Sequence, residues 1–202
     1  MRAALKGEND FQVGRRNFLR ASSVAAGGLL VSLYLDLPTL AQEGAPPAKA
    51  YPPDAFVHVK SDGKILITVN RLEFGQGVQT SLPMVLADEM DADWSQVVPE
   101  LAPAADVYKD PVFGIQMVGG SGSIAHSFQQ YRELGAKTRA MLIAAAAERW
   151  KVTPDQCSTE KSVVHGPGNR SASYAELAQD AARKPVPQNV RLKNHSDRKS
   201  VV

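Results

Sequence analysis

The 202-residue sequence predicts an α+β fold in which helices pack against a mixed sheet. Three observations predict this class. Residues 55–69 show a strand–turn–strand pattern, and residues 127–150 show the strongest helical pattern in the chain. Around them, short β-prone and helix-prone segments alternate, and neither an internal repeat nor a low-complexity tract is visible.

The elements follow in order from residue 55. F-V-H-V and I-L-I-T-V stand on either side of a turn at Asp62-Gly63, which predicts a β-hairpin. Apolar residues near helical spacing then predict a helix over 79–90. Residues 97–101 are predicted to form a further strand.

The segment 127–150 is predicted to be an amphipathic helix. Gly135 inside it costs about 1 kcal/mol of helix propensity, but it is small enough to let a neighbouring element pack closely. The expected apolar stripe consists of Leu134, Ala140, Leu142, Ile143, Ala146 and Ala147, and the residues expected on the solvated face are Arg132, Lys137 and Arg139.

After the long helix, residues 152–155 are predicted to begin another element, followed by two short strands around Glu160-Lys161 and an H-G-P-G-N turn. Ser173 and Glu176 have the spacing of a capping box, so a helix is expected over 174–182. Cys157 is the sole cysteine, which excludes an internal disulfide framework. We expect its role to be structural rather than nucleophilic.

The N-terminus resembles an export signal. Arg15-Arg16, then N-F-L-R and an uncharged stretch over 21–35, is typical of the twin-arginine route, which exports folded proteins. The apolar stretch is shorter than the roughly 20 residues of a membrane-spanning helix, so no stable membrane span is expected. We predict a signal peptide over 1–41, the twin-arginine translocase as a partner, and a periplasmic location. A general secretory signal and a retained anchor are the alternatives.

Residues 42–54 are predicted to be a Pro/Ala-rich linker. Removing residues 1–41 leaves 18 basic and 18 acidic residues, so the mild basicity of the whole chain belongs to the signal. No basic patch interleaved with aromatic residues remains, so no nucleic-acid partner is predicted.

Two glycine-rich turns are the candidate binding elements. The first is E-F-G-Q-G-V-Q-T at 73–80, between a predicted strand and a predicted helix, and the second is G-G-S-G-S at 119–123, directly before the long helix. Backbone amides at a helix start are suited to an anion, and Gln76 adds an amide that can donate and accept. Neither turn matches a Walker A or a G-x-G-x-x-G motif, and either one could be an ordinary strand-to-helix turn.

In the order of these motifs, the chain resembles the large, molybdopterin-binding subunit of the xanthine oxidase family of molybdenum hydroxylases, of the isoquinoline 1-oxidoreductase beta subunit type. The resemblance runs from the signal to about Lys193. It rests on E-F-G-Q-G-V-Q-T, L-A-D-E-M, V-G-G-S-G-S, E-L-G-A-K-T-R-A-M-L-I-A-A-A-A-E-R-W, S-Y-A-E-L-A and V-R-L-K.

The resemblance implies a molybdenum–molybdopterin cofactor, in its cytosine dinucleotide form, and oxidative hydroxylation of an aldehyde or N-heterocycle carbon with oxygen from water. It implies a small [2Fe–2S] subunit as electron acceptor and a cytochrome c beyond it. The cofactor-binding residues that it implies are Phe74, Gly75, Gln76 and Gly77 in the first turn and Gly120, Ser121 and Ser123 in the second.

The family's catalytic glutamate, in a late G-E motif, and its second glycine-phenylalanine turn have no counterpart here, so no catalytic residue is expected. Glu73 is expected to support its own turn, and Glu89 to lie on a solvated helix face. No Cys or His cluster suggests a metal site. The four histidines are each expected to be surface or packing residues: His58, His126, His165 and His195.

The sequence ends D-R-K-S-V-V, which has no evident structural logic. We therefore expect residues 55–196 to be the N-terminal part of a molybdopterin-binding domain, and residues 197–202 to be a non-native tail on an enzyme fragment inactive by itself. Two alternatives from other classes stay open: a non-catalytic periplasmic protein that binds an anion or another ligand, and an exported interaction module.

Overall fold

The computed structural model describes residues 29–31, 55–110 and 112–198. The predicted linker and most of the predicted signal peptide lie outside these residues, as do residues 199–202 of the predicted tail. Within the predicted signal, residues 29–31 form a strand of the main sheet.

The main sheet has four strands in the order β1-β2-β3-β4. The predicted hairpin is confirmed as β2 (Val57–Val59) and β3 (Ile65–Val69), which pair antiparallel with Val57 opposite Ile67. β1 (Leu29–Val31) pairs antiparallel with β2, whereas β4 (Val97–Leu101) runs parallel to β3, so the sheet is mixed, as predicted. At the hairpin turn, Gly63 has a φ of 88°, a left-handed conformation that glycine adopts readily.

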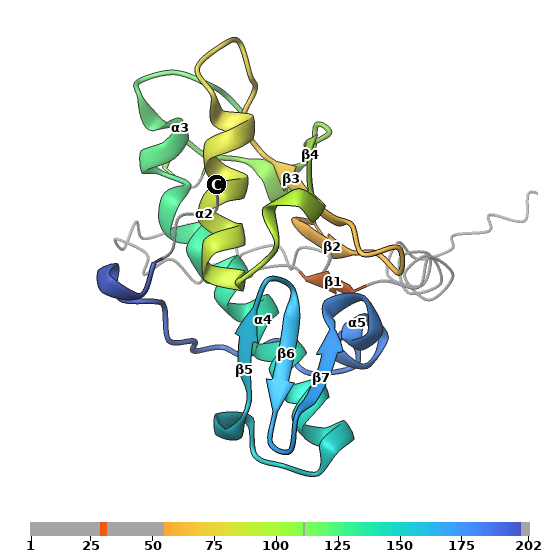
Figure 1. Ribbon diagram of the computed structural model, residues 1–202. Coiled ribbons are helices and arrows are strands. Elements are labelled where there is room, and N and C mark those ends of the chain that lie inside the picture. The colour runs from red at the N-terminus through yellow and green to blue at the C-terminus, as the bar shows by residue number, and fades with distance from the viewer. Residues whose placement is uncertain (1–28, 32–54, 111, 199–202) are drawn as a thin grey trace, which may run out of the picture.

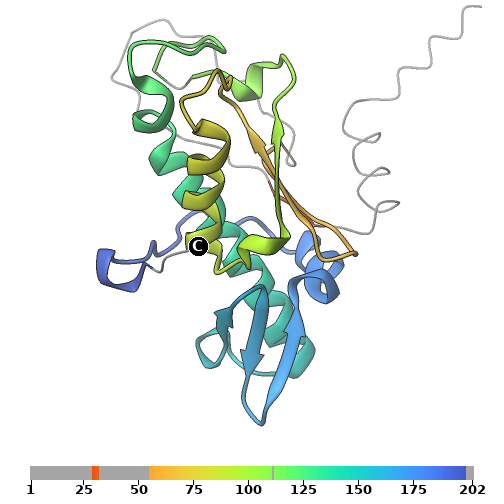
Figure 2. The same ribbon diagram turned by 45° about the horizontal axis from the view of Figure 1, so that its top comes forward.

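The parallel pair β3–β4 is connected through helix α2 (Val78–Met90), which confirms the helix predicted there. After β4 the chain reaches a four-residue helix, α3 (Gly122–Ala125), and then the long helix α4 (Phe128–Trp150). Figures 1 and 2 both show α2 packed beside α4. Helix α4 also contacts the main sheet directly, because the Tyr131 hydroxyl donates to the Thr68 carbonyl of β3. The start of α2 and the short helix α3 lie at the same end of the molecule in both views.

A second, smaller sheet lies against the C-terminal half of α4 (Figure 1). It is an antiparallel meander of β5 (Ser158–Glu160), β6 (Val163–Gly166) and β7 (Arg170–Ser173). The chain then enters α5 (Tyr174–Ala182), where Ser173 and Glu176 form the predicted capping box. Four short 3-10 helices complete the described elements, at Trp94–Gln96, Asp106–Tyr108, Pro154–Gln156 and His195–Asp197.

The core lies where α2, α4 and α5 meet the main sheet. Its largest fully buried apolar side chains are Phe56, Ile65, Ile67, Leu82, Leu86, Met90, Tyr131, Leu134, Leu142 and Tyr174. Burying one such side chain contributes about 1.5–3 kcal/mol. The two long helices approach closely at Gly135, where an added Cβ would lie 2.4 Å from the Leu86 carbonyl oxygen. The packing role expected for Gly135 is therefore confirmed.

The division of α4 into an apolar stripe and a solvated face is partly wrong. Lys137 is buried, and Arg132 and Arg139 are mostly buried in ion pairs rather than solvated. Ala140 and Ile143, expected in the stripe, are only half-buried. The physical reason is that α2, α5 and the second sheet all pack against α4, so no broad face of this helix is left to solvent.

Candidate functional site

The first glycine turn connects β3 to α2 and is largely exposed. Phe74 is 74% exposed, and Gly75 and Gly77 have φ values of 108° and 82°. An added Cβ at either glycine would meet no atom within 4 Å, so the backbone here faces open space. The Gln76 side chain folds back over the loop: its Nε2 donates to the Leu72 carbonyl at 2.6 Å, and its Oε1 accepts from the Phe74 amide at 2.8 Å.

Glu73 holds this turn together. Its carboxylate accepts hydrogen bonds from the amides of Gly75 (2.8 Å), Gly77 (3.0 Å) and Gln79 (2.9 Å). These bonds, led by those from Gln79 and Gly77, hold the pKa of the Glu73 carboxyl below its usual value. The supporting role expected of Glu73 is confirmed. The expectation that the backbone amides at this helix start could bind an anion is wrong, because they already donate to the Glu73 carboxylate.

The second glycine turn precedes α3 rather than the long helix, which corrects the expected placement. Gly120 and Ser121 both have a left-handed backbone, with φ values of 59° and 56°. Gly120 and Ser121 are exposed and Ser123 is half-buried, and the Ser121 side chain caps no amide of α3. Because α3 has only four residues, its dipole adds little, and the turn offers hydroxyls and backbone rather than a helix N-terminus.

A buried polar cluster connects the two turns, and the sequence reasoning missed it. Arg71, which lies between β3 and the first glycine turn, is 1% exposed. Its Nη1 lies 2.8 Å from Asp110 Oδ2, and its Nε and Nη2 donate to Ser127 Oγ at 2.9 and 2.8 Å. His126 Nδ1 lies 2.9 Å from the same Asp110 oxygen. Asp110 and Ser127 belong to the segments before and after the second turn.

Asp110 is held in its charged form. Burial acts to raise the pKa of this carboxyl, but the hydrogen bonds from His126 and from the amides of Phe113 and Val112 lower it, as does the charge of Arg71. The net result is a pKa below the usual value. Asp110 is therefore an anchor for the loop rather than a proton acceptor. No signal in the sequence marks it, because its partners are 16 and 39 residues away.

Large apolar side chains are exposed in the same loops: Leu72 and Phe74 in the first, Val112, Phe113 and Ile115 in the second, and Ile124 in α3. Phe113 packs edge-to-face on the His126 ring, with centroids 5.1 Å apart. The end of the molecule that carries both turns therefore combines exposed glycine backbone, small hydroxyls and apolar side chains.

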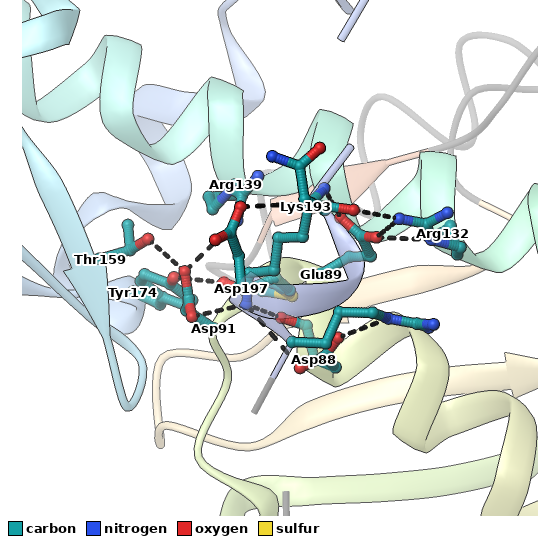
Figure 3. Close-up of polar contacts among 12 residues, drawn as sticks. Asp88, Glu89, Asp91, Arg132, Arg139, Thr159, Tyr174, Lys193 and Asp197 are labelled. Atoms are coloured by element: carbon teal, nitrogen blue, oxygen red, sulfur yellow. Dashed lines mark hydrogen bonds and ion pairs between the residues drawn. The ribbon is translucent and has the colours of Figure 1, made fainter. Parts of the chain in front are cut away.

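Glu89 lies in a different polar cluster, at the far end of α2 (Figure 3). It is 0% exposed, which makes the expectation of a solvated position wrong. Glu89 Oε1 accepts from Arg132 Nε at 2.6 Å, and its Oε2 accepts from the Lys193 amide at 3.0 Å. Because α4 and the C-terminal segment cover this face of α2, the carboxylate is paired internally and cannot serve as a free base.

Lys193 points into the same cluster (Figure 3). Its ammonium lies 2.8 Å from Asp91 Oδ1 and donates to the Asp88 carbonyl. Burial acts to raise the pKa of Asp91, but the hydrogen bonds from Lys193 and Thr159 and the charges of Lys193 and Arg139 outweigh it and hold the pKa below its usual value. Arg198, in the predicted tail, lies 3.4 Å from Asp88 Oδ2.

The remaining candidate groups have structural surroundings. Cys157 is half-buried and unbridged, and burial raises the pKa of its thiol, which disfavours the reactive thiolate. Across residues 29–31, 55–110 and 112–198, no three His, Cys, Asp or Glu side chains form a group that could hold a metal ion. Within those ranges, no helix is long and apolar enough to cross a membrane.

The sequence matches the molybdopterin cofactor-binding domain family over residues 31–200. It is 38% identical to the isoquinoline 1-oxidoreductase subunit beta of Brevundimonas diminuta, over 82% of this chain and 22% of that protein. It is 33% identical to a membrane-bound aldehyde dehydrogenase [pyrroloquinoline-quinone] of Gluconacetobacter polyoxogenes, over 63% of this chain and 16% of that protein. The chain thus spans about a fifth of the length of these relatives.

Among solved structures, quinoline 2-oxidoreductase from Pseudomonas putida 86 superimposes with a TM-score of 0.49 and 21% identity, over 64% of this chain and 16% of that one.

Proposed function

This chain belongs to the molybdopterin cofactor-binding domain family, and from that premise we propose that it forms one wall of the cofactor site in a molybdenum hydroxylase. The proposed reaction is hydroxylation of an aldehyde or N-heterocycle carbon, with oxygen from water. Relatives named for isoquinoline and aldehyde oxidation support this substrate class. The molybdenum cofactor, when bound, supplies the redox chemistry, and this chain supplies binding and orientation.

One observation carries the proposal: two exposed glycine turns lie at the same end of the molecule (Figures 1 and 2). Gly75 and Gly77 present backbone to open space, which allows a flat ligand to approach the main chain closely. The second turn adds the Ser121 and Ser123 hydroxyls, which can donate to phosphate oxygens. The residues present therefore fit the pterin and phosphate portions of such a cofactor.

Each residue of the first turn has a defined task in this proposal. Gln76 would hold the cofactor through its side-chain amide, after releasing the two loop contacts that it now makes. Phe74 would cover one face of the ligand, because its exposed ring has an apolar surface to bury. Glu73 keeps the loop in shape and does not contact the ligand, since its carboxylate is already occupied.

The proton acceptor for the reaction is proposed to come from outside residues 55–198. Of the carboxylates considered for that task, Glu73 is used by backbone amides and Glu89 is buried against Arg132. This agrees with a chain that spans only about a fifth of its relatives. The electron route is likewise proposed to leave this chain, through a small [2Fe–2S] subunit and then a cytochrome c.

Export is the remaining part of the proposal. The twin-arginine pattern supports passage of a folded, cofactor-loaded protein through the twin-arginine translocase to the periplasm. The cofactor is proposed to carry the cytosine dinucleotide. The alternative of a simple anion-binding protein is disfavoured, because Glu73 occupies the amides at the start of α2 that such an anion would need.

An exchange experiment tests the proposal. Residues 55–193 would replace the aligned segment of the B. diminuta beta subunit, expressed with the other subunits of that enzyme, and bound pterin and molybdenum would be measured. We expect cofactor retention in the exchanged enzyme and its loss in Gly77→Ala. Gly168→Ala is the matched control, because Gly168 also has a left-handed backbone (φ 70°) with no atom near an added Cβ, but lies in the β6–β7 turn. Equal cofactor content in the two variants would contradict the assignment of the first turn.

A further inference from the structure

Arg71 joins segments that are far apart in the sequence. It sits in the loop after β3, whereas Asp110 precedes the second glycine turn and Ser127 follows it. All three side chains are buried, with Arg71 and Ser127 at 1% and 0% exposure. A buried guanidinium with an ion pair on one side and a hydroxyl on the other is costly to displace. Ser127 Oγ would lose both bonds from Arg71, and Asp110 would keep only His126 and two backbone amides as partners.

The first turn does not depend on Arg71 for its shape or its base. Glu73 and Gln76 fix the inside of the loop. Tyr131 of α4 fixes its base, because its hydroxyl accepts from the Asn70 amide at 3.1 Å and donates to the Thr68 carbonyl at 2.7 Å. The first turn is thus held against α4 by contacts that exclude Arg71.

The second turn has weaker support of its own. Its left-handed residues Gly120 and Ser121 are exposed, and no side chain caps α3. The two ends of its segment are tied to the first loop through Arg71, at Asp110 on one side and Ser127 on the other. The Arg71 guanidinium is therefore positioned to determine where the second turn lies relative to the first.

We propose that Arg71 is the positioning residue that sets the spacing between the two cofactor-binding turns. This inference rests on the proposed function, since a single ligand must reach both turns for the spacing to matter. Arginine is required because its planar fork reaches Asp110 and Ser127 at once. A lysine presents a single point charge and cannot serve both partners with the same geometry.

The first test uses hydrogen exchange on the full chain, without cofactor. Arg71→Lys keeps the charge, and Ser127→Ala removes the hydroxyl alone, so both are milder than full truncation. We expect amides over 112–127 to exchange at least about tenfold faster in both variants, with those over 73–79 unchanged. The matched control is Arg139→Lys, which weakens a mostly buried ion pair with Asp91 elsewhere. The inference is overturned if residues 112–127 respond equally in the control, or not at all.

The second test places the same substitutions in the exchanged enzyme and measures the rate at which bound pterin is released. We expect about tenfold faster release with Arg71→Lys and Ser127→Ala than with Arg139→Lys. Equal release rates would overturn the positioning role. If the unmutated exchanged enzyme retains no pterin, the proposed function and the cofactor role of Arg71 fail together, while the exchange rates still decide whether Arg71 holds the second turn.

Discussion

The pairing of Lys193 with the carboxylates at the end of α2 gives a prediction whose size follows from the contacts. The perturbation is Lys193→Met, which keeps an unbranched chain of similar length but removes the ammonium. Asp91 then loses its partner at 2.8 Å and keeps Thr159 at 2.7 Å and the Arg139 guanidinium at 3.4 Å. Removing one member of a buried ion pair costs about 3–5 kcal/mol, and the two remaining contacts reduce this to roughly 2–4 kcal/mol.

The matched control is the same change at Lys64. Lys64 pairs with Asp62 at 3.8 Å, and the two side chains are 60% and 54% exposed, so the pair contributes about 0–1 kcal/mol. Urea unfolding followed by circular dichroism compares the two variants with the parent chain. A loss of about 2–4 kcal/mol corresponds to a melting temperature lower by roughly 4–16 °C in a chain of this size. Equal stability of the two variants would refute the conclusion that the C-terminal segment neutralises a buried acidic cluster.

Three further predictions concern α4, the first turn and acid stability. Gly135→Ala gains about 1 kcal/mol of helix propensity but places a Cβ 2.4 Å from the Leu86 carbonyl oxygen; overpacking costs about 1–3 kcal/mol or more, so we expect a net loss in chemical denaturation, and a gain would contradict the close approach of the helices. Glu73→Gln should raise the hydrogen-exchange rates of the loop amides that now donate to the carboxylate, without changing the rates of the α5 amides. Unchanged loop rates would show that the carboxylate does not hold the turn. The pKa values of Asp91 and Asp110 are lowered by folding, so their stabilisation is complete above their unfolded values near pH 4 and is lost as pH falls through the folded values. The free energy of unfolding should therefore drop between about pH 5 and 2, with a shallower slope in Asp91→Asn; an identical slope would exclude a contribution from Asp91.

The secondary structure could be predicted from local sequence patterns, because it depends mainly on interactions between residues that are close in the sequence. The Asp62-Gly63 turn, the capping box at Ser173 and the helix over 127–150 each depend on neighbours a few residues away, and each is confirmed, although the apolar stripe expected on that helix is not. The close packing predicted at Gly135 also follows from a local property, the absence of a side chain.

The charged clusters could not be predicted in the same way. Glu89 was expected on a solvated face because charged residues usually lie there, but its partners Arg132 and Lys193 are 43 and 104 residues away. Arg71 has the same difficulty, with Ser127 56 residues further on. One signal was present: Leu86, Ala87 and Met90 surround the acidic pair Asp88-Glu89, which leaves α2 little room for a solvated face.

The glycine turns show a mixed outcome. The first turn was predicted correctly to lie between a strand and a helix. Its backbone amides, expected to be available to an anion, donate instead to the Glu73 carboxylate. The second turn opens a four-residue helix instead of α4, because the chain continues through His126 and Ser127 before the long helix begins. Only the three-dimensional structure shows that the two turns lie at the same end of the molecule (Figure 2).

The most direct test of the central claim is the molar ratio of pterin to polypeptide in the enzyme whose beta subunit carries residues 55–193 of this chain. Oxidative release of the pterin followed by fluorescence gives the ratio. A ratio near that of the parental enzyme, falling with Gly77→Ala and not with Gly168→Ala, is the result predicted for a wall of the cofactor site. A correctly assembled enzyme without pterin, or one whose pterin content is unchanged by Gly77→Ala, would contradict the assignment of this chain to the cofactor site.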